Sequence, residues 1–424
     1  MKFTFLKNKY FVLGLSLLLF VGMVSFAFGF LPKNTLSFLK RKIFPNQYLV
    51  VDNTTSDNSA KSVDENSEPE TATENSSKDS FSPWQPGPQK TKPIVYPVPD
   101  MEKMKTRGCV ADGLLSGYNR TSKDVKVAKK SKCYFFSRAI ETWRDAPDFR
   151  QATKIMKDIG RDDVLYGMFI AEAINTKEKY IYYDEGRRFD FKKMCKKGSK
   201  NFWGEHTCKP SFAREEYRKY LKQITHQAMD IGIQVFLFGQ IYHQEEDLDH
   251  PWAPEIVKDM RKYAKQKNMR IVIGAQTNTI DDVDYLKLFD FIEGGVGLHS
   301  DGTVEDNACF SRWYDNQTGE GWCWALLWND KWKSKANNVF VHLDWSGKKG
   351  DDMSTFALMP EKLRHQTLKN LHRKFTSQGV GFLMPIITPL PKNNGGCHGP
   401  RKSFYSPSMK YGCKDLKSIN KILK

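Results

Sequence analysis

Three acidic residues, Glu172, Glu293 and Asp344, each lie at the end of an apolar run in the sequence. Cleavage of a glycosidic bond needs two carboxyl groups: one protonates the departing oxygen, and the other attacks the sugar carbon or activates water. Two carboxyl groups in one pocket also shift their pKa values apart, so both roles coexist near neutral pH. We predict Glu293 as the general acid/base, Asp344 as the nucleophile or base, and Glu172 as a third candidate. The structural alternative for each is a helix cap or an ion pair with lysine.

Polar and aromatic residues near the same strand ends suit the handling of a sugar. The side-chain amides of Gln240, Gln276 and Asn278 are predicted to form hydrogen bonds with sugar hydroxyls. The rings of Tyr242 and Trp345 are predicted to stack on a sugar face. Each of these residues also fits an ordinary place in the core or at its rim, so both interpretations stay open.

Motifs for metal, phosphate and nucleophilic serine chemistry are missing from the sequence. His243, His299 and His342 are isolated, without the HxH or HExxH spacing of a zinc site, so no metal is expected. The sequence also contains no GxSxG, P-loop or GxGxxG motif. This argues against a serine hydrolase with a nucleophile elbow and against nucleotide enzymes, and no cofactor is expected.

The strands that must position these residues are visible as continuous apolar runs. Six such runs begin near residues 163, 234, 269, 288, 338 and 380, and helices or long loops separate them. Short runs that are apolar throughout are typical of strands buried on both faces of a parallel sheet, whose carboxyl ends bind ligands. Counted from residue 163, Glu172 ends the first strand, Glu293 the fourth and Asp344 the fifth.

Two weaker strand candidates, Cys133–Phe136 and Ser403–Ser406, bring the count to eight. We therefore predict an α/β fold, a (β/α)8-type TIM barrel with long loop insertions at 175–210 and 296–337. The alternative is an open doubly wound sheet, which usually has a glycine-rich phosphate turn after its first strand. The corresponding segment here, Ile170-Ala-Glu-Ala-Ile174, has no glycine.

This layout, over residues 160–410, resembles the TIM-barrel glycoside hydrolases in strand order, in the Phe291-Ile-Glu-Gly-Gly295 strand end and in the aromatic insertions. In the large clan with catalytic glutamates on the fourth and seventh strands, the resemblance implies that Glu293 is the fourth-strand acid/base. No glutamate near Ser403-Phe-Tyr-Ser-Pro407 matches the seventh-strand residue. Leu343-Asp-Trp345 is similar to the chitinase strand that ends in Asp-Trp-Glu, but Ser346 stands in place of the acid.

All eight cysteines lie beyond residue 100. In an exported protein an even number of cysteines favours disulfides over metal or redox chemistry, although spacing alone leaves many pairings open. The cysteines fall into four pairs of close neighbours, which predicts the bonds Cys109–Cys133, Cys195–Cys208, Cys309–Cys323 and Cys397–Cys413. Each bond would close a short loop and stabilise the fold by roughly 3 kcal/mol.

Residues 1–33 are predicted to be a signal peptide or a transmembrane signal-anchor. The uncharged run Phe11–Phe30 follows three lysines and is long enough to cross a bilayer, while Ser25-Phe-Ala27 also fits a cleavage site. Residues 34–100 are predicted to be a disordered linker, acidic and rich in Ser, Thr and Asn and then rich in proline. Residues 101–424 are predicted to form the barrel domain.

The chain carries a formal net charge of +17, and residues 51–80 hold eight acids and two bases, so the remainder is at +23. A surface this basic attracts polyanions. The basic residues are spread along the chain without a base-stacking motif, so nucleic acid is not an expected partner.

The leading hypothesis is an extracytoplasmic glycoside hydrolase, tethered to the membrane or secreted, whose substrate is a polysaccharide or glycoconjugate, expected to be anionic. Two other hypotheses stay open. One is a non-catalytic barrel that binds carbohydrate or an anionic polymer through the tryptophans of residues 309–332. The other is a structural surface protein whose basic head docks to an acidic polymer or a membrane.

Overall fold

The computed structural model describes residues 96–117, 121–310, 323–346, 350–390, 397, 404–408 and 412–424. The predicted signal or membrane segment and the predicted linker up to residue 95 lie outside these residues. In the described ranges, no helix combines the length and the apolar character needed to cross a bilayer.

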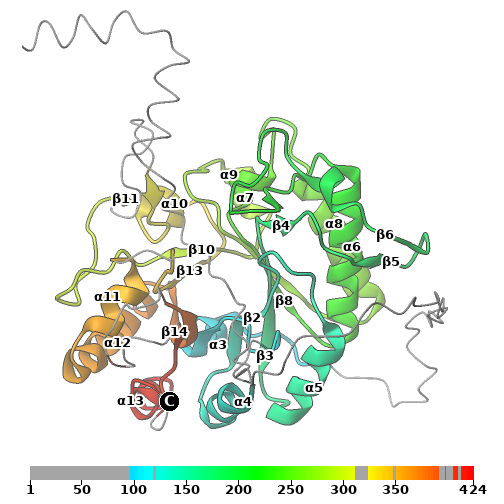
Figure 1. Ribbon diagram of the computed structural model, residues 1–424. Helices are drawn as coiled ribbons and strands as arrows, with labels where there is room; N and C mark the ends of the chain where they lie inside the picture. Colours follow the sequence, from blue (N-terminus) through cyan, green and yellow to red (C-terminus); the bar gives the residue numbers. More distant parts are fainter. Residues whose placement is uncertain are drawn as a thin grey trace, which may run out of the picture. The chain divides into compact units, whose positions relative to one another are not determined.

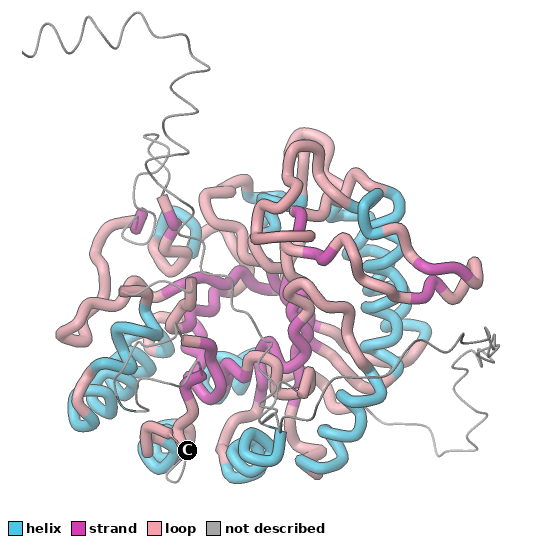
Figure 2. Tube along the Cα trace, in the orientation of Figure 1, coloured by secondary structure: helices cyan, strands magenta, loops and turns pink. Residues whose placement is uncertain are grey.

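Eight parallel strands form a closed barrel with helices around it (Figure 1). Each barrel strand pairs with the next, and the first pairs with the last, which closes the ring that Figure 2 shows. The barrel strands are β1 (Gly108–Ala111), β2 (Phe135–Glu141), β3 (Leu165–Ile170), β8 (Val235–Phe238), β9 (Val272–Ala275), β10 (Phe291–Gly295), β13 (Val339–His342) and β14 (Gly381–Pro389). The predicted (β/α)8 barrel is confirmed, and the open-sheet alternative is wrong because β1 pairs with β14.

Two of the predicted strand assignments need a closer comparison with the structure. Cys133–Phe136 does mark a barrel strand, since β2 starts at Phe135. Ser403–Ser406 does not: it contains β15 (Phe404–Tyr405), which pairs antiparallel with β14 outside the parallel barrel. The eighth barrel strand is instead β1, a four-residue segment with the sequence Gly-Cys-Val-Ala.

The positions of the predicted acids in the barrel change accordingly. Two barrel strands, β1 and β2, precede the apolar run near residue 163, which the sequence analysis takes as the first strand. Glu172 therefore follows the third strand, Glu293 lies in the sixth and Asp344 follows the seventh. The implied match of Glu293 to a fourth-strand acid/base is wrong for this reason.

Helices connect the strands, and the longer ones cover the outside of the barrel. They are α3 (Met101–Arg107), α4 (Thr121–Lys130), α5 (Phe149–Ile159), α6 (Glu215–Asp230), α7 (Ile241–Gln244), α8 (Ala253–Gln266), α9 (Val283–Lys287), α10 (Asp330–Lys333), α11 (Asp352–Leu358), α12 (Glu361–Thr376) and α13 (Leu416–Ile422), together with the 3-10 turn η1 (Phe191–Met194). Local signals set their ends. Asp148 accepts two backbone N–H bonds at the start of α5, and Gly160, with a φ of 59°, ends it. Pro254 lies in the first turn of α8, where its missing N–H costs nothing.

The interior of the barrel is apolar at the end where the strands begin. Phe135, Phe291 and Phe340 are completely buried and belong to one cluster, separate from the cluster between the barrel and its helices. Met104 of α3, the helix that leads into β1, packs into the same interior cluster. Polar strand-end residues are therefore left to the opposite end, where the strands finish.

Two insertions extend from the carboxyl ends of barrel strands. The first follows β3 and contains two small antiparallel pairs, β4 (Ile174–Asn175) with β7 (Thr207–Cys208) and β5 (Ile181–Tyr182) with β6 (Arg187–Arg188). The second follows β10 and contains β11 (Cys309–Phe310) paired with β12 (Trp324–Ala325). Both insertions leave the barrel at the end where ligands bind in this fold.

The four predicted disulfides are confirmed, and every cysteine takes part in one. The bonds are Cys109–Cys133, Cys195–Cys208, Cys309–Cys323 and Cys397–Cys413. The second closes the β3–α6 insertion, and the third bridges the β11–β12 insertion. Four disulfides in one chain are typical of proteins outside the cytoplasm.

Candidate active site

Polar side chains gather where the barrel strands end. They are Asp112 after β1, Arg138 and Glu141 in β2, Glu172 after β3, Gln240 after β8, Gln276 after β9, Glu293 in β10, and His342 and Asp344 at the end of β13. All of them are buried or half-buried. Because parallel barrel strands finish at one rim, residues far apart in the sequence meet there. All three predicted catalytic acids belong to this cluster.

His342 joins two of the predicted acids. Its Nε2 lies 3.1 Å from Oδ1 of Asp344, and its Nδ1 lies 3.2 Å from Oε1 of Glu293. The two acids come from adjacent strands, since β10 pairs with β13. Only the protonated ring carries hydrogen on both nitrogens, which suits a place between two carboxylates. Burial alone would lower the pKa of His342, but the charge of Glu293 and the hydrogen bond to Asp344 outweigh it, so the pKa is raised.

Glu293 is as deeply buried as Glu172. It is completely buried, and burial raises its pKa, while the positive charges of His342 and Arg138 and a hydrogen bond from Gln276 lower it in part. Its contact with His342 is close but not aligned as a hydrogen bond, so the attraction is mainly between charges. Glu293 therefore acts on the cluster chiefly through His342.

Arg138 supplies a second buried cation. Its Nε lies 2.6 Å from Oδ1 of Asp112, and its Nη2 lies 3.2 Å from Oε2 of Glu141. The register of β2 shifts between Phe136 and Ile140, and Arg138 in this bulge has a φ of 59°. Such strained non-glycine residues cluster at functional sites. Burial would lower the pKa of Arg138, but the nearby carboxylates outweigh it, so the side chain stays positively charged.

The environment of Glu172 favours the neutral form of its carboxyl group. It is completely buried, and burial raises its pKa to about 8, with further contributions from the charges of Glu141 and Asp344. The side-chain amide of Gln240 donates to its Oε1, and the hydroxyl of Tyr242 donates to Gln240 at 2.7 Å. Its Oε2 has no hydrogen-bond partner among the described residues. At neutral pH the carboxyl group is therefore mostly protonated.

Gly239 leaves the space that Glu172 occupies. A Cβ at this position would lie 2.6 Å from Oε2 of Glu172 and closer still to the ring of Phe169. We expect Gly239→Ala to lower the free energy of unfolding by about 1–3 kcal/mol, the usual cost of overpacking a core, as measured by urea unfolding. The same substitution should cost less in a Phe169→Leu background, where the clash with the ring is relieved. Equal costs in the two backgrounds would show that this contact is not the cause.

The predicted substrate-binding amides make different contacts. Gln276 accepts a hydrogen bond from the backbone N–H of Gln240 at 3.3 Å, and its side chain lies close enough to Glu293 to lower the pKa of that carboxyl group in part. Asn278 accepts a hydrogen bond from the backbone N–H of Ala325 at 2.8 Å, so it anchors β12 of the second insertion. The structure thus brings Gln240 and Gln276 to the acids and ties Asn278 to the insertion.

Asp352, at the start of α11, holds the strand ends that carry Glu293 and Asp344. Its carboxylate accepts hydrogen bonds from the backbone N–H groups of residues 296–298 at 2.6 to 3.1 Å and from that of Asp344 at 3.3 Å. One carboxylate therefore fixes the segments after β10 and β13 together. Trp345, next to Asp344, is half-buried, and its indole N–H has no partner in the described part of the chain.

Several residues of the cluster were missed by reasoning from sequence. Asp112 follows the unpredicted strand β1, and Arg138 and Glu141 lie in a strand that was only a weak candidate. His342 was considered only as a metal ligand. A signal for Arg138 was present: a lone arginine interrupts the apolar run from Phe135 to Ile140.

The tryptophans of the second insertion pack inward wherever the structure describes them. Trp324 and Trp332 are buried, and the half-buried Trp328 donates its indole N–H to the backbone oxygen of Val296 at 3.2 Å. Trp313 and Trp322 lie outside the described residues. The described tryptophans are therefore packing residues rather than an exposed sugar-binding surface.

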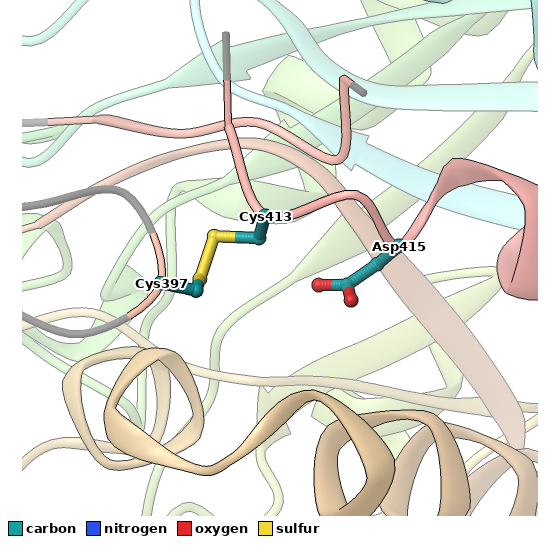
Figure 3. Close-up of side chains that lie close together, drawn as sticks. All are labelled: Cys397, Cys413 and Asp415. Atoms are coloured by element: carbon teal, nitrogen blue, oxygen red, sulfur yellow. A yellow bond between two sulfur atoms is a disulfide. The ribbon is translucent and has the colours of Figure 1, made fainter. Parts of the chain in front are cut away.

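Cys397, Cys413 and Asp415 lie within 4.8 Å of one another by their ligand atoms (Figure 3). The two sulfur atoms form a disulfide, so neither is a thiolate that could bind a metal. Asp415 is engaged by the guanidinium of Arg364 at 3.0 Å and by the hydroxyl of Tyr405 at 2.9 Å. This buried group ties α12 to α13 and is a structural element.

No protein-family model matches the sequence, and no curated protein matches it. Solved structures with a similar fold include the cyclic α-maltosyl-(1→6)-maltose hydrolase from Arthrobacter globiformis in complex with maltose, at 11% identity and a TM-score of 0.45, over 75% of this chain and 76% of that chain. A debranching enzyme from Nostoc punctiforme is 8% identical, with a TM-score of 0.45, over 78% of this chain and 81% of its own.

A family 27 β-L-arabinopyranosidase from Geobacillus stearothermophilus is 12% identical, with a TM-score of 0.31, over 46% of this chain and 54% of its own length. This chain therefore spans about half the length of that enzyme. At such identities the likeness to these hydrolases is one of fold alone.

Proposed function

We propose that this protein is a glycoside hydrolase that acts on a polysaccharide or glycoconjugate outside the cytoplasm. The observation that carries the proposal is the meeting of three carboxyl groups, Glu172, Asp344 and Glu293, at the strand-end rim of the barrel, where burial raises the pKa of Glu172 to about 8. Glycosidic cleavage needs this combination: one acid that is protonated at the working pH and one that is ionised.

Glu172 is the proton donor in this proposal. Its Oε1 accepts the amide hydrogen of Gln240, so the acidic proton resides on Oε2, the atom without a partner among the described residues. In this proposal Oε2, which is buried in the structure, donates to the departing glycosidic oxygen once a substrate is bound. Glu293, which was predicted for this role from the sequence, lies against the ring of His342, whose positive charge offsets part of the rise in pKa that burial causes.

Asp344 is the proposed nucleophile or base. It is the least buried of the three acids, at 8% exposure, while Glu172 and Glu293 are completely buried. The hydrogen bond from His342 orients one of its oxygens and stabilises the charged carboxylate. Whether this carboxylate attacks the sugar carbon or activates water, it must be ionised when Glu172 donates its proton.

Glu293 is the proposed positioning residue. Glu293 lies next to Nδ1 of His342, and Asp344 lies next to Nε2 on the other side of the ring. The charge of Glu293 therefore keeps the ring protonated and holds the orientation of the ring. Arg138 balances the charge of Asp112 and Glu141 in the same way. The cluster thus contains the cations needed to keep several acids together without disrupting the fold.

A direct measurement tests the link between Glu293 and His342. We expect Glu293→Gln to lower the pKa of His342, because the charge of Glu293 is the largest influence that raises it. Titration of the imidazole signals by NMR measures this shift. The control is Glu205→Gln, which removes an exposed carboxylate beside His206. A His342 pKa that is the same in Glu293→Gln and wild type would remove Glu293 from the mechanism.

The remaining contacts to substrate are assigned to side chains near the acids. We place Tyr242 and Trp345 against the sugar, since both are half-buried and adjoin Gln240 and Asp344. Gln240 and Gln276 support the acids and are close enough to the cluster to meet a sugar hydroxyl as well.

The proposed location is the outer surface of the cell or the medium. Four disulfides fit an oxidising compartment, and the apolar run Phe11–Phe30 fits a signal peptide or membrane anchor. In this arrangement residues 34–100 act as the tether that lets the barrel reach a polymer.

The test of the proposal is the release of new reducing ends from a panel of polysaccharides and glycoconjugates. Wild type is expected to release them from at least one member, and a folded double variant, Glu172→Gln with Asp344→Asn, is expected to release none. Equal release by the two proteins would reject the site. Binding without release by wild type would reject hydrolysis and favour the non-catalytic binding hypothesis.

A further inference from the structure

An aromatic cluster lies directly beside Glu172, on residues that the proposed chemistry does not use. Trp203 of the first insertion donates its indole N–H to the backbone oxygen of Glu172 at 3.3 Å. Its ring centroid lies 4.7 Å from that of Phe202, 5.3 Å from that of Trp143 and 5.9 Å from that of His243. We call these four residues the rim cluster. They come from the segment after β2, the first insertion and α7.

The rim cluster is open to solvent, unlike the aromatic residues of the core. Phe202 is 47% exposed, and Trp143, Trp203 and His243 are half-buried. Aromatic rings that stay exposed beside polar groups mark binding surfaces in soluble proteins. Here the exposed rings adjoin the residue that we propose as the proton donor.

A lysine lies on the rim cluster without an acidic partner. Nζ of Lys209 lies 3.5 Å from the ring centroid of Phe202 and 3.2 Å from Nδ1 of His243. An ammonium group can only donate, so His243 accepts through Nδ1 and is neutral, and burial lowers the pKa of His243 to about 3. Among the described residues, no carboxylate lies within ion-pair distance of Lys209.

A second lysine adds to the positive charge at this place. Lys196 is close enough to lower the pKa of Lys209, whose burial lowers it to about 8, and its backbone N–H donates to the backbone oxygen of Lys209 at 2.8 Å. Lys196 directly follows Cys195, and Lys209 directly follows Cys208. The Cys195–Cys208 disulfide therefore fixes both lysines on the insertion.

We propose that the rim cluster, with Lys209 and Lys196, is a subsite for an acidic saccharide. The sugar ring stacks on Phe202 and Trp203, and its carboxylate or sulfate group binds the ammonium group of Lys209. The inference rests on the proposed function, since the subsite would hold a sugar next to the glycosidic bond that is cut. Binding of the acidic saccharide at the subsite does not itself require hydrolysis.

The experiment uses an array of saccharides that carry carboxylates, sulfates or no charge, probed with the full chain bearing Glu172→Gln so that hydrolysis cannot remove the ligand. We expect binding to acidic saccharides and weaker or no binding to their neutral counterparts. Comparison of the carboxylated with the sulfated members identifies the acidic group. Equal binding to neutral and acidic saccharides, or binding to none, would overturn the inference.

The role of Lys209 is tested on the saccharide that binds best. Lys209→Met, added to the same chain, is expected to weaken binding about tenfold, since it removes a charge-assisted hydrogen bond but keeps the apolar stem. It should also reduce the dependence of binding on salt. Lys200→Met, which removes an exposed charge from the same insertion, is the control and should change binding little. Equal effects of the two variants would reduce the subsite to general basic charge and overturn the proposal.

These measurements separate the subsite from the catalytic proposal. If wild type hydrolyses no saccharide, but binding to acidic members depends on Lys209, the subsite stands and hydrolysis does not. If wild type hydrolyses a neutral saccharide, and Lys209→Met affects neither binding nor turnover, hydrolysis stands and the subsite does not.

Discussion

Glu172→Gln is expected to lower kcat by about 10³-fold on a natural glycoside, within the range found when a general acid is removed. Glutamine has nearly the shape of glutamate and can keep the contact with Gln240, but it has no acidic proton for the departing oxygen. With an aryl glycoside whose leaving group needs no protonation, the same variant should lose less than about tenfold. Steady-state kinetics on the two substrates measures this difference.

The dependence on the leaving group distinguishes Glu172 from a merely structural residue. Asp344→Asn is the matched comparison: as the nucleophile or base it is needed with either leaving group, so both substrates should slow to a similar extent. Glu205→Gln, in the same insertion and exposed, should leave both rates unchanged. If Glu172→Gln slowed the two substrates equally, the assignment of Glu172 as the proton donor would fail.

The pH dependence of activity is an independent test of Glu172 as the proton donor. The pKa of Glu172 is raised to about 8, so the protonated, active form of a general acid is lost as the pH rises through that value. Wild type is therefore expected to lose activity on the alkaline side. Glu172→Gln should remove that alkaline limb from what activity remains.

Much of the barrel was predictable because several strands are buried on both faces. β9, β10 and β14 read as continuous apolar runs and were placed from sequence within a few residues of their observed bounds. β1 could not be found in this way. It has four residues and starts with glycine. Its place in the barrel depends on pairing with β14, which is distant in sequence, and with β2, which was only a weak strand candidate.

The site was predictable only as far as it follows the strand ends. Glu293 and Asp344 stood out because each comes at the end of an apolar run. The part played by His342 depends on side-chain directions, since its two nitrogens meet carboxylates on different strands. Arg138 reaches the cluster from a bulge, and no pattern in the sequence marks where the register shifts.

Glu245 shows why an acid after a strand is not by itself a catalytic signal. It follows β8 and α7, but its carboxylate accepts hydrogen bonds from the backbone N–H groups of Trp252 and Ala253 at 3.1 Å. It therefore caps α8, the structural alternative that applied to every acid in the sequence. Glu172 differs because the contact to its Oε1 comes from the side chain of Gln240 rather than from the backbone at the start of a helix.

Mild acidification is expected to stabilise this protein, with the free energy of unfolding rising by about 2 kcal/mol from pH ~8 to pH ~6.5. Burial raises the pKa of several carboxyl groups: Glu172 to about 8, Glu141 and Asp351 to about 7 and Asp352 to about 6. In the unfolded chain such groups titrate near pH ~4. Between pH ~6.5 and ~8 the native state therefore binds more protons than the unfolded state, and stability falls as the pH rises.

Groups with the opposite shift act mainly outside this window. Burial lowers the pKa of His243 and His372, which makes stability increase with pH only up to the ordinary histidine value of about 6.5. Lys209, with a pKa lowered to about 8, has its effect above that value. His342, whose pKa is raised, has the same sign as the acids: its stabilisation is complete below its unfolded value and is lost as the pH rises through the folded one.

Urea unfolding at several pH values measures how the free energy of unfolding depends on pH. The Glu172→Gln variant shows how much of this dependence comes from Glu172. Replacing Glu172 removes a titrating group whose pKa is raised to about 8, so the slope of stability against pH should become shallower, above all between pH ~7 and ~8. Glu205→Gln should leave the slope unchanged, because that side chain is 78% exposed. Stability that stayed constant or rose with pH across the window would mean that these carboxyl groups are ionised in the native state. Glu172 would then hold no proton to give at neutral pH, and the acid step proposed for it would have no donor.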